Sequence, residues 1–288
     1  MEKLWQNKEW LENEYKTKGS TSIAREFNID DSTIIYWLRK FKIKIRSRRD
    51  SMLLFTNKIV DYNYFDNINS PTKAYWLGYF LADATMREYR PNCYQFMFEI
   101  KDHEMIDELI NDINFKGKVY YKNNGIKRLI ITNNSFCQSL MKHNIIPNKT
   151  GKEKYPNIQK ELNKYFIRGF FDGDGSIMYY DNTKDRRIRS RAHFICMNVE
   201  FLLKIKSIIE EETNIKFSPK AVHKKYVGSN VYEFETGTFK NIILLYKYLY
   251  DDKAPRLKRK EEKFKLAYNY AINSKRVIKR DSPTFMET

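Results

Sequence analysis

Two aspartates occupy equivalent positions near the ends of two similar stretches of the chain. The stretches are AYWLGYFLADATM (residues 74–86) and YFIRGFFDGDGSI (residues 165–177), and they align without gaps, with Asp83 and Asp174 91 residues apart. Burial of an unpaired carboxylate is costly, and a helix C-terminus adds further negative charge. A divalent cation between the acids relieves both effects, and oxygen ligands suit Mg²⁺. Such a metal site can activate water and stabilise the leaving oxygen when a phosphodiester is cleaved.

Two helices must bring these acids together. In each stretch small residues recur four positions apart, and therefore on one helix face. They are Gly78 and Ala82 in the first copy and Gly169 and Gly173 in the second. Small residues allow two backbones to approach closely, so we expect the helices to pack against each other. The acids then meet at one end of their interface.

The composition favours a polyanionic partner. The chain has 288 residues, 42% of them hydrophobic, and a net charge of +17, which favours nucleic acid. No apolar run approaches the ~20 residues that span a bilayer, and the first ten residues do not form a signal peptide. Three cysteines without a CxxC spacing exclude a disulfide scaffold and predict a reducing cytoplasm. Abundant Lys, Asn, Ile and Tyr hint at an AT-rich bacterial or phage genome.

The repeated stretches resemble the paired LAGLIDADG motifs of homing endonucleases, in their single-chain, two-motif form. The resemblance extends over roughly residues 63–265 and includes FDNINSPTKAYWLGYFLAD and HNIIPNKTGKEKYPNI. It implies an α+β fold in which two pseudo-symmetric αββαββα halves form a DNA-binding saddle. It also implies a monomer in which Asp83 and Asp174 bind Mg²⁺ and both DNA strands are cut, leaving short 3′ overhangs. The chain departs from the motif at Leu81, where many members have an acid, and at Ala84, which replaces the closing glycine.

Two lysines are expected to support the acids. Lys149 corresponds to a lysine that the family places near the scissile phosphate, where it would stabilise transition-state charge or activate solvent. By pseudo-symmetry the second half should supply a basic partner from Lys258, Arg259 or Lys260. We choose Lys260, with a phosphate clamp as the alternative role.

A basic strand is predicted in the second half. Arg187, Arg189 and Arg191 alternate with other residues at the period of a strand, which would space them about 6.5 Å apart on one face. Such a ribbon suits a major groove, where arginine pairs with guanine or phosphate. An exposed basic arm is the alternative. Residues 220–226, which include Lys224, are expected to add DNA contacts.

Residues 20–43 carry two short helical patterns separated by a turn. This arrangement is typical of a DNA-binding helix-turn-helix, with a purely structural helical hairpin as the alternative. The side chains expected to face DNA are Ser32, Thr33, Tyr36, Arg39 and Lys40. The basic tether that follows, with Arg46 and Arg48, is expected to follow phosphates.

These features predict five segments. They are a helix-turn-helix domain with its tether (1–50), a linker (51–70), two LAGLIDADG halves (71–158 and 159–270) and a C-terminal tail (271–288). Two other functions compete with DNA cleavage: an intron maturase, which would bind intron RNA, and a non-catalytic DNA-binding regulator. The two acids with Lys149 argue against the regulator. The helix-turn-helix favours duplex DNA, because the deep, narrow major groove of RNA resists side chains.

Overall fold

The computed structural model describes residues 3–47, 50–51, 60–182, 187–217, 222–226 and 228–273, and for 181–182 and 187–189 the backbone alone. It divides into two compact units: Met1–Asp61 with Asn114–Gly117, and Tyr62–Ile113 with Lys118–Thr288. None of the helices in the described ranges combines the length and the apolar character that a membrane crossing requires. The five segment boundaries given above remain predictions.

The front unit is a small cluster of helices. A 3-10 helix, Leu4–Gln6, precedes α1 (Lys8–Thr17), α2 (Ser20–Glu26) and α3 (Asp31–Lys40). Apolar residues at helical spacing face one core, which contains Leu11, Tyr15, Ile23, Ala24, Ile34 and Leu38. Asn28 makes the turn between α2 and α3 at φ 53°, in the left-handed region that asparagine tolerates. The Asp30 side chain accepts a hydrogen bond from the Ser32 amide at 2.8 Å and so starts α3.

The first half of the second unit follows the order αββαββα. Its elements are α5 (Pro71–Asp83), β1 (Thr85–Arg90), β2 (Cys93–Ile100), α6 (His103–Asp112), β3 (Val119–Tyr121), β4 (Lys127–Ile131) and α7 (Asn134–Met141). The strands form an antiparallel sheet in the order β1-β2-β4-β3, with Thr85 opposite Met97. Every second residue of β2 from Phe96 to Ile100 is buried under the helices, and the residues between are more exposed.

The second half repeats this order and adds one helix. After a 3-10 helix (Lys160–Leu162) come α8 (Asn163–Gly173), β5 (Ser176–Asn182), β6 (Arg187–Cys196), α9 (Val199–Glu212), β7 (His223–Lys224), β8 (Tyr232–Thr236), α10 (Phe239–Tyr250) and α11 (Lys258–Ile272). The strand order is β5-β6-β8-β7, and Ser176 lies opposite His193. Helix α11 packs against α10 and β5. The predicted α+β class with two pseudo-symmetric halves is confirmed, and α11 is an addition to the expected pattern.

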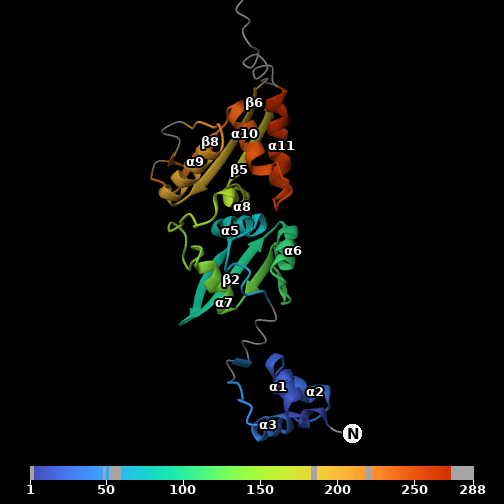
Figure 1. Cartoon of the computed structure of the whole chain (residues 1–288). Coiled ribbons are helices and arrows are strands. Elements are labelled where there is room, and N and C mark those ends of the chain that lie inside the picture. The colour runs from blue at the N-terminus through green and yellow to red at the C-terminus, as the bar shows by residue number, and fades with distance from the viewer. Residues whose placement is uncertain are drawn as a thin grey trace, which may run out of the picture. The chain divides into compact units, whose positions relative to one another are not determined.

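Helices α5 and α8 join the two halves. They lie side by side between the two sheets (Figure 1) and make the most extensive contact between any two elements of the described chain. The residues that follow each helix lead directly into the first strand of its own sheet. The crossing therefore fixes where the ends of the two motif stretches meet.

Candidate active site

The two helices touch through backbone at their glycines. A Cβ atom built on Gly78 would lie 2.0 Å from the carbonyl oxygen of Phe166, and one built on Gly169 would lie 2.0 Å from that of Tyr75. These two contacts are pseudo-symmetric, because Gly78 and Tyr75 lie 91 residues before Gly169 and Phe166. A Cβ on Gly173 would similarly lie 2.3 Å from that of Ala82. The structure thus places all four of the small residues proposed for this interface in it.

The crossing brings the two motif acids together. Asp83 is the last residue of α5, and Asp174 follows the last residue of α8. A Cβ atom built on Gly173 would lie 3.5 Å from Oδ2 of Asp83, so this carboxylate reaches the end of the other helix. Ala84 adopts an ordinary extended conformation at φ −79° and ψ 153°, so the first motif does not need glycine at that position.

Both acids are exposed, yet the surrounding protein raises the pKa of each. Partial burial raises the pKa of Asp83, an effect that Lys260 and Lys149 oppose. Partial burial and the charge of Asp83 together raise the pKa of Asp174 to about 6. Lys149 and Lys260 also oppose the rise at Asp174 but do not cancel it.

A hard cation fits this pair of acids. Within the described ranges no three His, Cys, Asp or Glu side chains converge on one point, so the protein would supply two carboxylates. Mg²⁺ is commonly bound by one or two carboxylates and keeps water or phosphate oxygens as its other ligands. The donor set therefore fits a magnesium ion that also contacts a phosphate.

Asp172 lies two residues before Asp174, and its role differs from that of the motif acids. It is 1% exposed and accepts hydrogen bonds from the Tyr75 hydroxyl at 3.0 Å, the Tyr250 hydroxyl at 2.6 Å and the Leu257 amide at 2.8 Å. Burial raises its pKa, although these donors oppose the rise. Asp172 therefore ties α8 to α5, to the end of α10 and to the start of α11.

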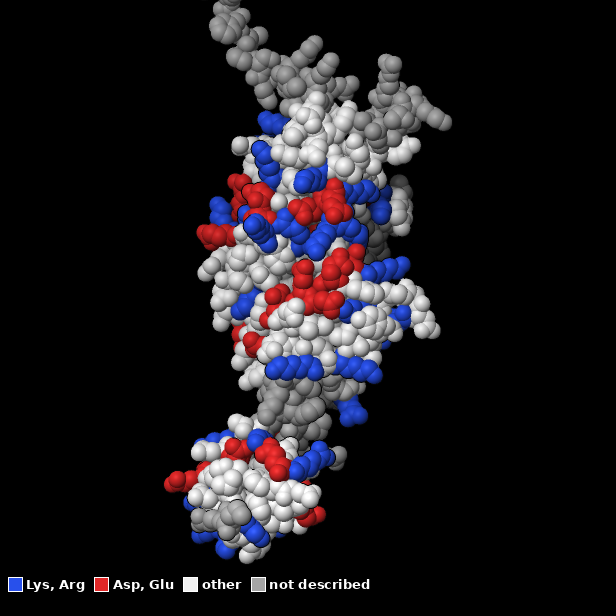
Figure 2. All heavy atoms as spheres, turned by 90° about the vertical axis from the view of Figure 1, so that its right-hand side faces the viewer, with Lys and Arg blue, Asp and Glu red and all other residues white. Residues whose placement is uncertain are grey.

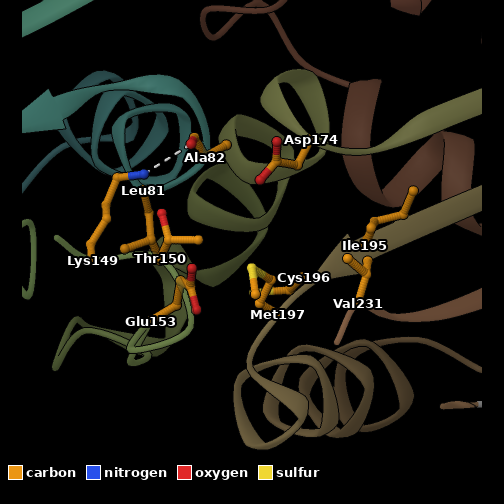
Figure 3. Close-up of a pocket in the computed structure, with 10 residues that line it drawn as sticks. All are labelled: Leu81, Ala82, Lys149, Thr150, Glu153, Asp174, Ile195, Cys196, Met197 and Val231. Atoms are coloured by element: carbon orange, nitrogen blue, oxygen red, sulfur yellow. Dashed lines mark hydrogen bonds between the residues drawn. The ribbon is translucent and has the colours of Figure 1, made fainter. Parts of the chain in front are cut away.

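Lys149 lies in the turn after α7 and points to the end of α5. Its Nζ donates a hydrogen bond to the carbonyl oxygen of Ala82 at 2.9 Å, and the residue is 9% exposed. Burial lowers its pKa, while Asp174, Glu153 and Asp83 raise it. Lys149 and Asp174 line an open hollow of about 410 Å³ (Figure 3). The structure thus brings the first predicted lysine to the acid pair.

Lys260 lies in the first turn of α11 and caps the end of α8. Its Nζ donates to the carbonyl oxygens of Phe171 at 2.7 Å, Asp172 at 2.7 Å and Gly173 at 3.0 Å, and also to that of Gly175. Burial lowers its pKa to about 8. A cation at a helix C-terminus satisfies carbonyls that lack partners within the helix. Gly173 and the Ala82 that Lys149 contacts are equivalent residues, so the two lysines occupy pseudo-symmetric places.

The predicted DNA contacts of the second half are only partly described. Arg187 and Arg189 lie in β6, as expected, but their side chains fall outside the described part of the chain. Arg191 is exposed and forms an ion pair with Glu235 at 2.8 Å. Lys224 lies in β7 and is exposed. The sequence did not predict the partner of Arg191.

The front unit presents several of its predicted DNA contacts on α3. Ser32, Tyr36, Arg39 and Lys40 are exposed, Thr33 is half-buried, and the Lys40 ammonium lies 4.2 Å from the centre of the Trp37 ring. Arg46 behaves differently from a free tether residue: its guanidinium lies 4.0 Å from the centre of the Tyr15 ring and donates to the Lys18 carbonyl. Arg48 falls outside the described residues.

One face of the second unit carries charges of both signs. Figure 2 shows acidic and basic side chains intermingled on the side where α6 and α11 lie. The charged residues around a hollow lined by α6, α11 and the loop before α11 are Glu108, Asp252, Lys253, Arg256, Lys258, Glu261, Glu262 and Lys265. Arg259 of α11 also donates to both oxygens of Asp102, at 2.8 and 3.0 Å, and so links the two halves. A face of mixed sign suits polyanion binding less well than a uniformly basic one.

Comparison with known proteins supports the fold. No family model matches the chain, and no curated protein matches it. Among solved structures, meganuclease I-SmaMI bound to uncleaveable DNA is 11% identical over 70% of this chain and 90% of its own, with a TM-score of 0.52. LAGLIDADG meganuclease I-AabMI bound to uncleaved DNA is 13% identical over 74% of this chain and 92% of its own, with a TM-score of 0.51. LAGLIDADG homing endonuclease I-GzeII in complex with its DNA target is 13% identical over 73% of this chain and 95% of its own, with a TM-score of 0.51.

These likenesses define the class of fold. The chain has the two-sheet, paired-helix fold of the LAGLIDADG endonucleases, and the resemblance found in the sequence is confirmed at that level. At such low identity the comparison does not extend to activity, which depends on the site itself.

Proposed function

We propose that the chain is a site-specific endonuclease that binds a long duplex DNA target and cuts both strands, leaving short 3′ overhangs. The observation that carries this proposal is the meeting of Asp83 and Asp174 at the ends of α5 and α8, with a lysine at each helix end. The solved structures with this fold are described as meganucleases or homing endonucleases bound to DNA.

The acids and the lysines would have different roles in hydrolysis. Asp83 and Asp174 would hold Mg²⁺, which when bound supplies Lewis-acid stabilisation of charge on the phosphate oxygens. Lys149 lies at the edge of the hollow and would stabilise negative charge that develops on the phosphate. Lys260 holds the carbonyls at the end of α8 and thereby positions Asp174, which follows that helix directly.

Two surfaces would bind the DNA. The open face of each sheet carries exposed polar side chains, such as Arg87 on β1 and Arg191 on β6, which would contact the saddle-shaped footprint. Helix α3 of the front unit would contact a separate flank through Tyr36, Arg39 and Lys40. Because one chain holds both halves, we expect it to cut as a monomer.

The proposal is tested by selection followed by cleavage. Full-length protein is used without metal to enrich bound duplexes from a random-sequence library, and Mg²⁺ is then added to the enriched duplex. We expect cuts in both strands at staggered positions, mapped by sequencing of the ends. An enriched duplex that stays intact in Mg²⁺ and in Mn²⁺ would identify a DNA-binding regulator instead, and enrichment of RNA over DNA in a parallel selection would favour a maturase.

A further inference from the structure

A carboxylate that belongs to neither motif lines the hollow beside Lys149. Glu153 is 7% exposed, and its Oε2 atom is buried without a hydrogen-bond partner among the described residues. A buried carboxylate oxygen without a partner is costly, so such a group calls for an explanation in a ligand or in water. The residue lines the same hollow as Lys149 and Asp174 (Figure 3).

The backbone of the loop fixes this side chain. The Lys152 amide donates to the Lys149 carbonyl at 2.7 Å, and Gly151, inside this turn, adopts φ +78°, a conformation that favours glycine. The Gly151 amide then donates to Oε1 of Glu153 at 2.9 Å. With Oε1 held by the loop, Oε2 is the oxygen that remains for a ligand.

The neighbours of Glu153 offer it one weak donor. The Cys196 thiol, whose pKa burial raises to about 12, interacts with the Glu153 side chain, but a neutral thiol is only a weak hydrogen-bond donor and leaves the carboxylate able to accept from water. The negative charge of Glu153 also raises the pKa values of Lys149 and Asp174, so it acts on both sides of the hollow. The hollow of about 410 Å³ has room for several waters.

Among the described residues, the other lysine has no comparable acid beside it. Apart from the motif pair, the carboxylates whose charges act on the Lys260 side are Asp172 and Asp102, and both have partners. Asp172 accepts from two tyrosines and an amide, and Asp102 is paired with Arg259. Among the described carboxylates that act on the two lysines, the buried oxygen without a hydrogen-bond partner is therefore Oε2 of Glu153, on the Lys149 side.

We propose that Glu153, if the proposed function holds, is the proton acceptor for the water that attacks one of the two DNA strands. Oε2 accepts a hydrogen bond from a water in the hollow and orients it. As the water oxygen forms its bond to phosphorus, its proton passes to Oε2, the bond from phosphorus to the leaving oxygen breaks, and that oxygen takes a proton from solvent. Glu153 later releases its proton to solvent through the open hollow. Because the described residues on the Lys260 side include no such group, the second strand is cut without it.

The test follows each strand separately. A duplex that the wild type cuts, with a different fluorophore on each strand, is cleaved under single-turnover conditions by wild type and Glu153→Gln. We expect one strand to be cut about 10²-fold more slowly by the variant, so that nicked DNA accumulates, while the other strand keeps its rate. Glu153→Asp, which keeps the carboxylate, should retain part of the rate on the affected strand.

Controls separate this role from a structural one. Glu161→Gln makes the same chemical change at an exposed acid outside the hollow and should cut both strands normally. Melting temperature and DNA affinity of Glu153→Gln, measured without metal, should match those of wild type. Equal slowing of both strands, or wild-type rates on both, overturns the inference alone. A wild type that cuts neither strand overturns the proposed function as well.

Discussion

The ends of α5 and α8 are equivalent in sequence but differ in their surroundings. Both lysines are buried, but Lys149 donates one hydrogen bond, to the end of α5, and lines an open hollow, whereas Lys260 donates four, to carbonyls at and just after the end of α8. The helix crossing itself is symmetric, since Gly78 and Gly169 make the same backbone contact. The two lysines thus occupy equivalent places but make different contacts. We propose that Lys149 serves the chemistry and that Lys260 chiefly holds the helix end.

The largest expected effect comes from replacing an acid that cleavage of both strands requires. Asp83→Asn and Asp174→Asn should each reduce cleavage of both strands at least 10³-fold, because the amide cannot supply the charge that binds Mg²⁺. Affinity for the same duplex, measured in EDTA, should change little. Strand-resolved cleavage assays check this, and a variant that still cuts one strand at full rate would show that the acids act separately.

The lysines should separate catalysis from stability. Lys149→Ala should slow cleavage about 10²-fold with an almost unchanged melting temperature, since it removes an electrostatic stabiliser of the phosphate. Lys260→Ala should instead unfold more easily, by on the order of 3 kcal/mol, because it leaves several buried carbonyls without a donor.

The matched control for this pair is Lys258→Ala, an exposed lysine in the same turn of α11. It should alter neither the cleavage rate nor the urea midpoint. If Lys260→Ala retains the wild-type urea midpoint and loses activity instead, the two lysines are functionally equivalent and the contrast between them is wrong.

The sequence predicted what local periodicity and small residues determine. Spacings of two and 3.6 residues indicated the strands and helices, and four small residues indicated the crossing that unites Asp83 and Asp174. The position of Lys260 also carries a local signal that distinguishes it from its basic neighbours. Lys260 shares one helix face with buried Phe264, Ala267 and Ala271, while Lys258 is exposed.

The remaining features depend on contacts between distant segments. Asp172 accepts from Tyr75, Tyr250 and Leu257, which are 97, 78 and 85 residues away. In the sequence, the local sign that Asp172 differs from the motif acids was that Leu81 occupies the equivalent position in the first copy. Glu153 likewise lines the hollow because a turn folds it back, and no spacing in the sequence indicates that turn's direction.

A smaller effect is expected in the pH dependence of folding stability, measured in the absence of metal. The pKa of Asp174 is raised from 3.8 to about 6, so between these values the folded protein retains a proton that the unfolded chain has released. Stability should therefore fall as pH rises through this window and level off above it. Because Asp174 is exposed, solvent screening should keep the change modest.

Asp174→Asn provides the comparison for this effect. In EDTA it should lack this part of the pH dependence and melt above wild type at pH 7, although it cannot cut. Mg²⁺ should raise the melting temperature of wild type and not that of the variant, because a ligand that binds the folded state stabilises it. Equal pH profiles for the two proteins would show that the folded protein does not raise the pKa of Asp174.

The smallest effect on cleavage should come from removing the front unit, which leaves both lysines in place. Deletion of residues 1–50 removes α3 with Tyr36, Arg39 and Lys40, but no residue of the acid pair or of the hollow. The protected DNA should therefore shorten at one end only, and cleavage at saturating protein should persist with the same ratio between strands. Affinity should fall, and its salt dependence should flatten by about 0.9 in log–log slope for each phosphate that the shortened protein no longer neutralises. Footprinting of both proteins on one target decides this, because an unchanged footprint would mean that α3 does not bind the target.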